Sequence, residues 1–378
     1  MTDIYEQSVE LHRKMQGKLS IQSKVKLETK EDLSLAYTPG VGRVCELIGK
    51  DISLARELTF KGNSVAVVTD GSAILGLGNL GPEAALPVME GKAILFKEFG
   101  GIDAVPICLA TQDTEEIIAA VKAIAPTFGG INLEDISAPR CFEIEARLKK
   151  ELNIPVMHDD QHGTAMVVLA ALINALKLRK SNASEVRIVI NGAGAAGVAV
   201  TDLLMEYGSK NIVVCDSKGV LSKARTDLNR EKERLARVTN PNDVSGALSD
   251  AIKEADVFIG VSVKDALDAS LIRTMADRPI IFALANPIPE IMPNDAKAAG
   301  AYIVATGRSD FPNQINNVLA FPGIFRGALD HQVTDITNSM LTRAAENLAG
   351  YVRDISPENI LPSALDKGAA VVVAEAIR

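Results

Sequence analysis

The stretch Val186-Arg-Ile-Val-Ile-Asn-Gly-Ala-Gly-Ala-Ala-Gly197 joins a run of β-branched residues to a glycine-rich turn. The turn has G-x-G-x-x-G spacing, with its glycines at Gly192, Gly194 and Gly197. Residues 198–207 then have the composition of a helix, whose N-terminal N–H groups and dipole favour a pyrophosphate. A second predicted strand, 211–215, ends in Asp216, at the distance expected for an acid that accepts from ribose hydroxyls. The stretch therefore predicts a Rossmann-type dinucleotide-binding unit.

The expected cofactor contacts lie on this turn and at the ends of later strands. They are Gly192, Ala193, Gly194, Ala195, Ala196, Gly197, Asp216 and Ser262. Asp216 would repel a 2′-phosphate and therefore favours NAD. Ser217 and Lys218 follow it directly and could bind that phosphate, so NADP remains the alternative.

A second glycine triplet has the same spacing in a different context: Gly76, Gly78 and Gly81. It begins several residues beyond the predicted strand 65–69, and a proline follows it directly. The next apolar strand, 104–109, ends without an acid. We therefore interpret this triplet as a loop kept slim for the close approach of another backbone or a ligand.

Length and composition narrow the class of protein. A chain of 378 residues exceeds the usual size of one hydrophobic core, so two domains are expected. The formal net charge of −8 and the absence of a Lys/Arg-dense block argue against nucleic acid or an anionic membrane as partner. Without an apolar N-terminal or membrane-spanning stretch, we expect a cytoplasmic small-molecule enzyme. Unpaired spacing in apolar surroundings predicts buried free thiols for Cys45, Cys108, Cys141 and Cys215.

Apolar periodicity predicts an α/β fold with a helical N-terminal segment over residues 1–60. Short apolar runs alternating with helical periods are typical of βα units. In the first unit, strands are expected at 65–69, 104–109, 131–133 and 154–157, and helices at 114–124 and 139–152. Residues 164–177 are apolar nearly all round and predict a buried helix between two domains. In the second unit, strands are expected at 186–190, 211–215, 257–260, 280–284 and 302–305.

Two domains follow from this pattern. We assign residues 1–162 plus 317–378 to an α/β catalytic domain, and residues 163–316 to a doubly wound, parallel dinucleotide-binding domain. The predicted helices 318–330 and 338–348 are expected to pack back on the first domain, because the second already has its strands.

Acids follow several strands of the first unit: Asp70, Glu134, Asp135, Asp159 and Asp160. Ligands bind beyond the carboxyl ends of strands in open parallel sheets. Carboxylates gathered there raise one another's pKa unless a metal or Lys/Arg side chains neutralise them. Oxygen-only ligation favours Mg²⁺ or Mn²⁺ over zinc. Alternatively, Asp159 and Asp160 only cap a helix that starts near Gly163.

Four further side chains allow either a structural or a functional role. His158 and His162 are four residues apart, but no glutamate follows the first, so we read them as orienting groups rather than zinc ligands. Lys92 follows a glycine and precedes an apolar run, which predicts a partly buried ammonium with a depressed pKa. Tyr37 lies in a Pro/Gly turn rather than on an apolar face.

Taken together, these motifs resemble the malic enzyme family, and specifically its short prokaryotic branch. The matching motifs are Tyr37-Thr-Pro-Gly-Val, Val68-Thr-Asp-Gly, Ile74-Leu-Gly-Leu-Gly, Gly91-Lys, Leu133-Glu-Asp, His158-Asp-Asp-Gln-His-Gly-Thr, Asn191-Gly-Ala-Gly-Ala-Ala-Gly, Ala285-Asn-Pro, Asn316-Asn-Val and Phe321-Pro-Gly. The resemblance implies metal-dependent oxidative decarboxylation of L-malate to pyruvate and carbon dioxide with reduction of NAD(P), and extends to decarboxylation of oxaloacetate. It also implies a homodimer or a larger homo-oligomer.

The resemblance assigns roles to individual residues. Lys92 would be the general base, Tyr37 the general acid and Asp159 an acid that supports Lys92. The implied metal ligands are Glu134, Asp135 and Asp160. Asn286 and Asn317 would contact the substrate carboxylate or the nicotinamide side, so Asn286 is an implied cofactor contact as well as a substrate contact. Ser72 is a further candidate for substrate binding. Larger members of the family carry a substrate-clamping arginine where this chain has Ala73, so another group must bind that carboxylate. The candidates are the two asparagines, the turn around Asp70 to Ser72, and a residue from a partner chain.

Two other functions stay open on the sequence alone. An amino-acid dehydrogenase would also combine a lysine base with two domains, but it would need no metal. A nucleotide-binding regulatory module would bind the cofactor without turnover.

Overall fold

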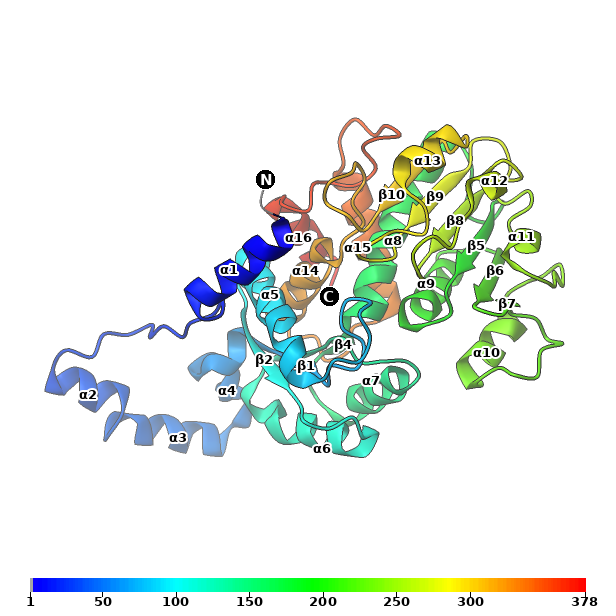
Figure 1. Ribbon diagram of the computed structural model, residues 1–378. Coiled ribbons are helices and arrows are strands. Elements are labelled where there is room, and N and C mark those ends of the chain that lie inside the picture. Colours follow the sequence, from blue (N-terminus) through cyan, green and yellow to red (C-terminus); the bar gives the residue numbers. More distant parts are fainter. Residues whose placement is uncertain (1–2) are drawn as a thin grey trace.

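Two sheets organise the computed structural model, which describes residues 3–378 (Figure 1). The first sheet is parallel, with order β2-β1-β3-β4. Its strands are β1 (Ser64–Thr69), β2 (Asp103–Cys108), β3 (Gly130–Leu133) and β4 (Val156–His158). The second has order β10-β9-β8-β5-β6-β7, and only β7 runs antiparallel to its neighbour. Its strands are β5 (Arg187–Asn191), β6 (Asn211–Asp216), β7 (Gly219–Val220), β8 (Val257–Gly260), β9 (Ile280–Ala283) and β10 (Ile303–Thr306).

Helices cover the sheets and connect their strands. Those of the first sheet are α5 (Pro82–Gly100), α6 (Thr114–Ile124) and α7 (Arg140–Glu151). Those of the second are α9 (Ala195–Glu206), α10 (Arg230–Val238), α11 (Leu248–Ala251), α12 (Ala269–Ile272) and α13 (Pro293–Ala298). The C-terminal helices are α14 (Phe321–Asp330), α15 (Asn338–Tyr351) and α16 (Lys367–Ala374). Helices α14 and α16 contact α5, so the C-terminus returns to the first sheet. Short 3-10 turns are η1 (Ile52–Leu54), η2 (Phe60–Asn63), η3 (Ala125–Thr127) and η4 (Asn317–Leu319).

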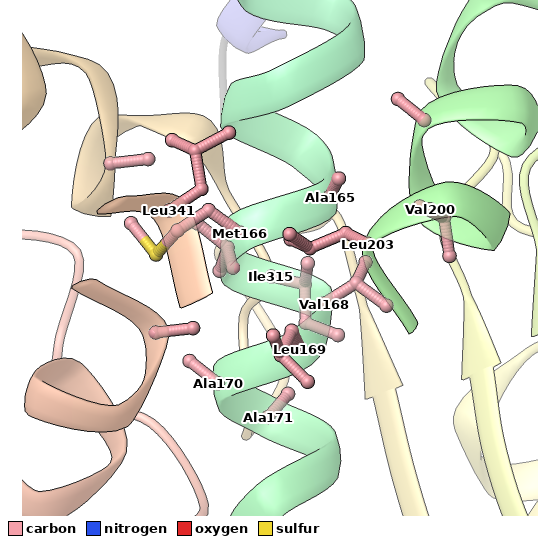
Figure 2. Close-up of a cluster of buried hydrophobic side chains, with 14 of the residues drawn as sticks. Ala165, Met166, Val168, Leu169, Ala170, Ala171, Val200, Leu203, Ile315 and Leu341 are labelled. Atoms are coloured by element: carbon pink, nitrogen blue, oxygen red, sulfur yellow. The ribbon is translucent and has the colours of Figure 1, made fainter. Parts of the chain in front are cut away.

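Helix α8 (Asp159–Arg179) joins the two sheets and is buried along most of its length. Its apolar composition all round is explained by neighbours on two sides, since it packs against α9 and against α15. Figure 2 shows Val200 and Leu203 of α9 on one side of α8 and Leu341 of α15 on the other. By length and composition α8 is the one helix among the described residues that could cross a membrane, yet 78% of its most apolar window is buried inside the protein.

The strand order of each sheet reverses once, and the functional motifs lie in the loops after the strands at these reversals. In the second sheet the chain leaves β5 toward β6 on one side and later pairs β8 on the other. In the first sheet β1 has β2 on one side and β3 on the other. Such switch points open a crevice at the carboxyl ends of the strands. The glycine turn after β5 and the acids after β1 and β3 therefore lie at the two expected binding edges.

The N-terminal helices form an arm with little cover. They are α1 (Ile4–Met15), α2 (Lys30–Ala36), α3 (Gly40–Lys50) and α4 (Ala55–Leu58), and none contains a buried residue. Helices α2 and α3 project from the body of the protein, whereas α1 lies beside α5 (Figure 1). The apolar side chains that this arm exposes include Ile21, Val25, Leu27, Leu33, Leu35 and Tyr37.

The expectation of four buried thiols is wrong for two of them. All four cysteines are free, but Cys45 is exposed and Cys108 is half-buried. Cys45 lies on α3, which contains no buried residue, so apolar neighbours in sequence do not bury it. Cys141 and Cys215 are buried, and desolvation raises the pKa of each thiol to about 12.

Candidate active site

A cavity of about 680 Å³ collects residues from both sheets and from the N-terminal segment. From the first sheet and its helices it takes Lys92 of α5 and the three acids Glu134, Asp135 and Asp160. From the second sheet and the loop that follows it, the cavity takes Ala196, Ser262, Asn286 and Asn317. The structure therefore brings the predicted base, metal ligands and amide contacts into one space.

Three carboxylates in this cavity form a set suited to a divalent metal. Glu134, Asp135 and Asp160 each offer one oxygen, and these oxygens lie within 4.8 Å of one another. The Asp135 Oδ2 atom is buried without a hydrogen-bond partner. Burial and the nearby Asp160 raise the pKa of Asp135 to about 7, and burial also raises that of Glu134. Hard oxygen donors with an unsatisfied acceptor and mutual repulsion fit Mg²⁺ or Mn²⁺.

Lys92 lies between two carboxylates. Its Nζ atom is 2.6 Å from Asp159 Oδ2 and 2.8 Å from Glu134 Oε1. Asp159 is fully buried and also accepts a hydrogen bond from Asn317 Nδ2 at 2.8 Å. Burial alone would lower the pKa of Lys92, but Asp159 and Glu134 outweigh burial and raise it. The predicted depressed pKa is therefore wrong for this state, because the sequence does not show that two acids converge on the ammonium.

Asp70 forms an ion pair with an arginine and is not part of the acidic cluster. It is fully buried, and Oδ2 lies 2.9 Å from Arg140 of α7. Its Oδ1 accepts from Ser72 Oγ at 2.6 Å. Ser72 also accepts from the backbone N–H of Ser137 and is not among the residues that line the cavity. Ser72 therefore holds this turn together, while its neighbour Ala73 and the other candidate substrate contacts line the cavity.

The glycine turn borders a second cavity of about 430 Å³. Its lining includes Asn191, Gly192, Ala193, Gly194, Asp216, Ser217, Lys232 and Ser262. A Cβ atom on Gly197 would lie 1.8 Å from the Gly192 carbonyl oxygen, so the turn tolerates no side chain there. Ala195 starts α9 behind the turn. Because Ser262 lines both cavities, a dinucleotide that lies along the turn can reach the space beside Lys92.

Asp216 is held by two cations that the sequence did not single out. Its carboxylate accepts from Arg225 at 2.7 Å and from Lys232 at 2.7 Å. Burial alone would raise the Asp216 pKa, but these two cations lower it to about 2. Lys218, expected as a phosphate ligand, pairs with Asp227 at 2.8 Å. Arg225 lies in the charged stretch 222–237, and nothing in its local pattern points to Asp216.

Glu290 is a further residue that sequence reasoning missed. It is fully buried and accepts from the backbone N–H groups of Ser262 at 2.9 Å and Ala285 at 3.0 Å. One carboxylate thereby fixes the loops after β8 and β9, which carry the expected contacts Ser262 and Asn286. A buried glutamate that binds backbone N–H groups is not part of any sequence motif, so a single sequence does not reveal it.

The second glycine triplet forms a close backbone contact, as its interpretation predicted. A Cβ atom on Gly76 would lie 2.7 Å from the Asn286 carbonyl oxygen. Gly76 also has φ of +74°, a conformation that side chains disfavour. The loop thus lets the first sheet approach the strand-end residues of the second.

Helix α8 begins earlier than expected. It starts at Asp159, so Asp159, Asp160 and His162 all lie in its first turn, and the alternative that the two aspartates only cap a helix starting near Gly163 is wrong. Their carboxylates instead contact Lys92 and the acidic cluster. His162 Nε2 lies 3.0 Å from buried Glu145 of α7, which makes it a packing partner rather than a metal ligand. His158 is fully buried at the end of β4.

Tyr37 does not reach the cavity of its own chain. It follows α2 on the projecting arm, its residue surface is 66% exposed, and it is absent from the cavity lining. The other predicted catalytic residues, Lys92 and Asp159, are in direct contact.

Comparison with known proteins identifies relatives along the whole chain. The sequence models of the malic enzyme N-terminal domain and of the malic enzyme NAD binding domain match residues 16–149 and 161–377. The bifunctional malic/malolactic enzyme of Bacillus subtilis is 56% identical over 375 residues, which cover 98% of this chain and 92% of the relative. The NAD-dependent malic enzyme of Geobacillus stearothermophilus is 54% identical, over 96% of this chain and 76% of the relative. The crystal structure of the NAD-dependent malic enzyme from Thermotoga maritima matches 98% of both chains with a TM-score of 0.95 and 51% identity. The chain belongs to the malic enzyme family.

Proposed function

We propose that the protein oxidises and decarboxylates L-malate to pyruvate and carbon dioxide with reduction of NAD(P). One arrangement supports this proposal: buried Lys92 lies between Asp159 and Glu134, and Glu134 also belongs to the cluster of three carboxylates. Both groups lie in or beside a cavity that reaches the glycine-turn domain. A dehydrogenase without a metal would have no use for Glu134, Asp135 and Asp160 in this geometry.

Each group has a chemical role in this reaction. In its neutral form, Lys92, which Asp159 presents to the cavity, accepts the proton of the C2 hydroxyl as the hydride leaves C2 for the nicotinamide. A metal that neutralised Glu134 would remove one of the two charges that raise the Lys92 pKa, and so would favour this neutral form. A divalent metal held by Glu134, Asp135 and Asp160 would supply Lewis-acid polarisation of the C2 oxygen. Asn317 donates to Asp159 and lines the cavity, so it both orients this acid and is available to the substrate.

We assign binding and chemistry to different parts of the chain. Residues 1–162 with 317–378 hold the substrate and the metal, and residues 163–316 hold the dinucleotide. Two features support this division: α14 and α16 contact α5, which carries Lys92, and the glycine turn lies in the second sheet. Asn286, from the second part, reaches the shared cavity and would contact the nicotinamide side of the substrate.

Mixing the protein with L-malate, Mn²⁺ and NAD or NADP is expected to yield reduced cofactor and pyruvate. Removing the metal with a chelator should abolish the rate, because the clustered carboxylates then repel the substrate's own carboxylates. The measurement is absorbance of the reduced nicotinamide together with pyruvate. A rate that chelator leaves unchanged would contradict the metal's role, and a rate only with L-amino acids would favour an amino-acid dehydrogenase.

Replacing Asp160 with asparagine is expected to weaken Mn²⁺ binding at least tenfold, since one of three anionic ligands becomes neutral while the shape is kept. Titration calorimetry without substrate measures this directly. Asp113, which caps α6 away from the cavity, offers the matched exchange Asp113→Asn. Equal Mn²⁺ affinity in both variants would place the metal elsewhere.

We further propose that the protein acts as a homodimer in which Tyr37 enters the partner's cavity. The exposed apolar side chains of the arm would then be covered by the second copy, and a closed twofold pair uses the same surface twice. Among the described residues of one chain no tyrosine lines the cavity, and Tyr37 is exposed on the projecting arm. In the dimer, Tyr37 would protonate C3 after carbon dioxide leaves.

NAD is the proposed cofactor in preference to NADP, because the Asp216 carboxylate occupies the place of a 2′-phosphate among Arg225 and Lys232. The exchange Asp216→Ser is expected to reverse this preference. It removes the repelling charge and leaves both cations available to a phosphate. We expect kcat/KM with NADP to rise at least tenfold and that with NAD to fall. Unchanged ratios would show that Asp216 does not face the adenosine ribose.

A further inference from the structure

The N-terminal segment forms one wall of the cavity that contains Lys92. Ser8 and His12 of α1 and Lys18 beyond its end all line this space. Lys18 attaches the segment to α5: its backbone N–H donates to Glu90 Oε2 at 3.0 Å, and Nζ donates to the Pro87 carbonyl at 2.8 Å. The Lys18 ammonium lies so close to α5 that a Cβ atom on Gly91, the neighbour of Lys92, would be 3.6 Å from Nζ.

The charged residues around the cavity, without Lys18, leave one carboxylate of a bound dianion without a cationic partner. Malate carries two carboxylates, so this step rests on the function proposed above. Among the described residues the lining supplies the lysines Lys18 and Lys92 and the imidazole of His12. Lys92 is already paired with Glu134 and Asp159. A metal would be neutralised largely by Glu134, Asp135 and Asp160. The other residues of the nearby wall, Ala73, Leu75 and Gly76, bring no charge.

Lys18 has hydrogen-bonding capacity to spare. Its ammonium carries three N–H groups, and the side-chain hydrogen bond in the structure uses one of them on a neutral carbonyl. The Glu90 carboxylate attracts the Lys18 ammonium electrostatically, but the hydrogen bond that Glu90 accepts comes from the Lys18 backbone N–H. Partial burial weakens competition from water, which strengthens attraction to an anion.

We infer that Lys18 is the substrate-binding cation of this site, and that it holds the carboxylate that remains on the product. A cation fixed on the departing carboxylate would oppose its loss of charge, whereas one on the retained carboxylate binds substrate and transition state alike. Such uniform binding lowers KM with little effect on kcat. Lys18 therefore takes the role that an arginine at position 73 has in larger family members. It is placed there by the N-terminal segment, whose helix α1 lies beside α5 (Figure 1).

The test compares Lys18→Gln with wild type and with Lys14→Gln, which removes the same charge from an exposed position on α1. We expect the KM for malate to rise roughly ten- to hundredfold in Lys18→Gln, with kcat changed less than about threefold. Calorimetric Mn²⁺ and NAD affinities should stay at their wild-type values, and Lys18→Arg should recover most of the loss.

A second variant separates binding from anchoring. Glu90→Gln weakens the attachment of the segment but keeps the cation, so it should raise KM far less than Lys18→Gln. An unchanged KM in Lys18→Gln, or an equal rise in Glu90→Gln, overturns the inference while leaving the malate reaction intact. A wild-type protein that does not turn over malate would instead contradict the proposed function itself.

Discussion

Replacing Lys92 with alanine is expected to lower kcat for malate oxidation about 10²–10⁴-fold, the range for loss of a positioned general base. The physical reason is that the described cavity offers no other amine next to Asp159 and the carboxylate cluster. Steady-state rates at saturating malate, Mn²⁺ and cofactor measure the loss. Lys97→Ala is the matched control, because Lys97 lies on the same helix but points to Asp103 at the surface. A variant that keeps more than a tenth of the wild-type kcat would contradict the assignment.

A companion variant separates the base from the ion pair. Lys92→Arg keeps a positive charge near Asp159 and Glu134, so it should fold and bind NAD, but a guanidinium does not give up its proton in the working pH range. It is therefore expected to remain nearly as inactive as Lys92→Ala. Recovery of activity in Lys92→Arg would mean that position 92 contributes charge alone.

Exchanging Tyr37 for phenylalanine is expected to lower kcat about 10²-fold or more, because C3 of the enol product loses its proton donor. The change removes one oxygen from a side chain that is 66% exposed in a single chain, so stability should change little. Melting temperature and kcat measured together test both parts. Tyr5→Phe, also on the arm and exposed, is the control that should keep full activity.

Much of this architecture is readable from the sequence because the relevant signals are local. The strand, glycine turn and helix around Gly192 follow from residue sizes within one short stretch, and the strands at 257–260 and 280–283 follow from apolar runs with clear ends. The gathering of Glu134 and Asp160 also followed, because parallel strands place their carboxyl ends at the same edge.

The remaining features depend on contacts between distant segments. Glu290 binds the backbone of two loops. Asp70 pairs with Arg140, and Asp216 pairs with Arg225. No spacing along the chain encodes these partners. The pKa of Lys92 had the wrong predicted direction for the same reason, since an apolar flank predicts desolvation but does not show two acids. Tyr37 is the extreme case, because its exposure and distance from the cavity suggest a partner in another copy of the chain.

We propose that each active site combines Lys92 of one chain with Tyr37 of another, and a mixture of two inactive variants provides the test. Lys92→Ala and Tyr37→Phe protein are unfolded together, refolded at equal concentrations and assayed with malate. Half of the randomly paired dimers are mixed, and each mixed dimer has one site with both residues intact, so about one quarter of the wild-type rate should return. If Tyr37 served its own chain, no site in the mixture would contain both residues. A mixture no more active than its two components would therefore contradict the shared site.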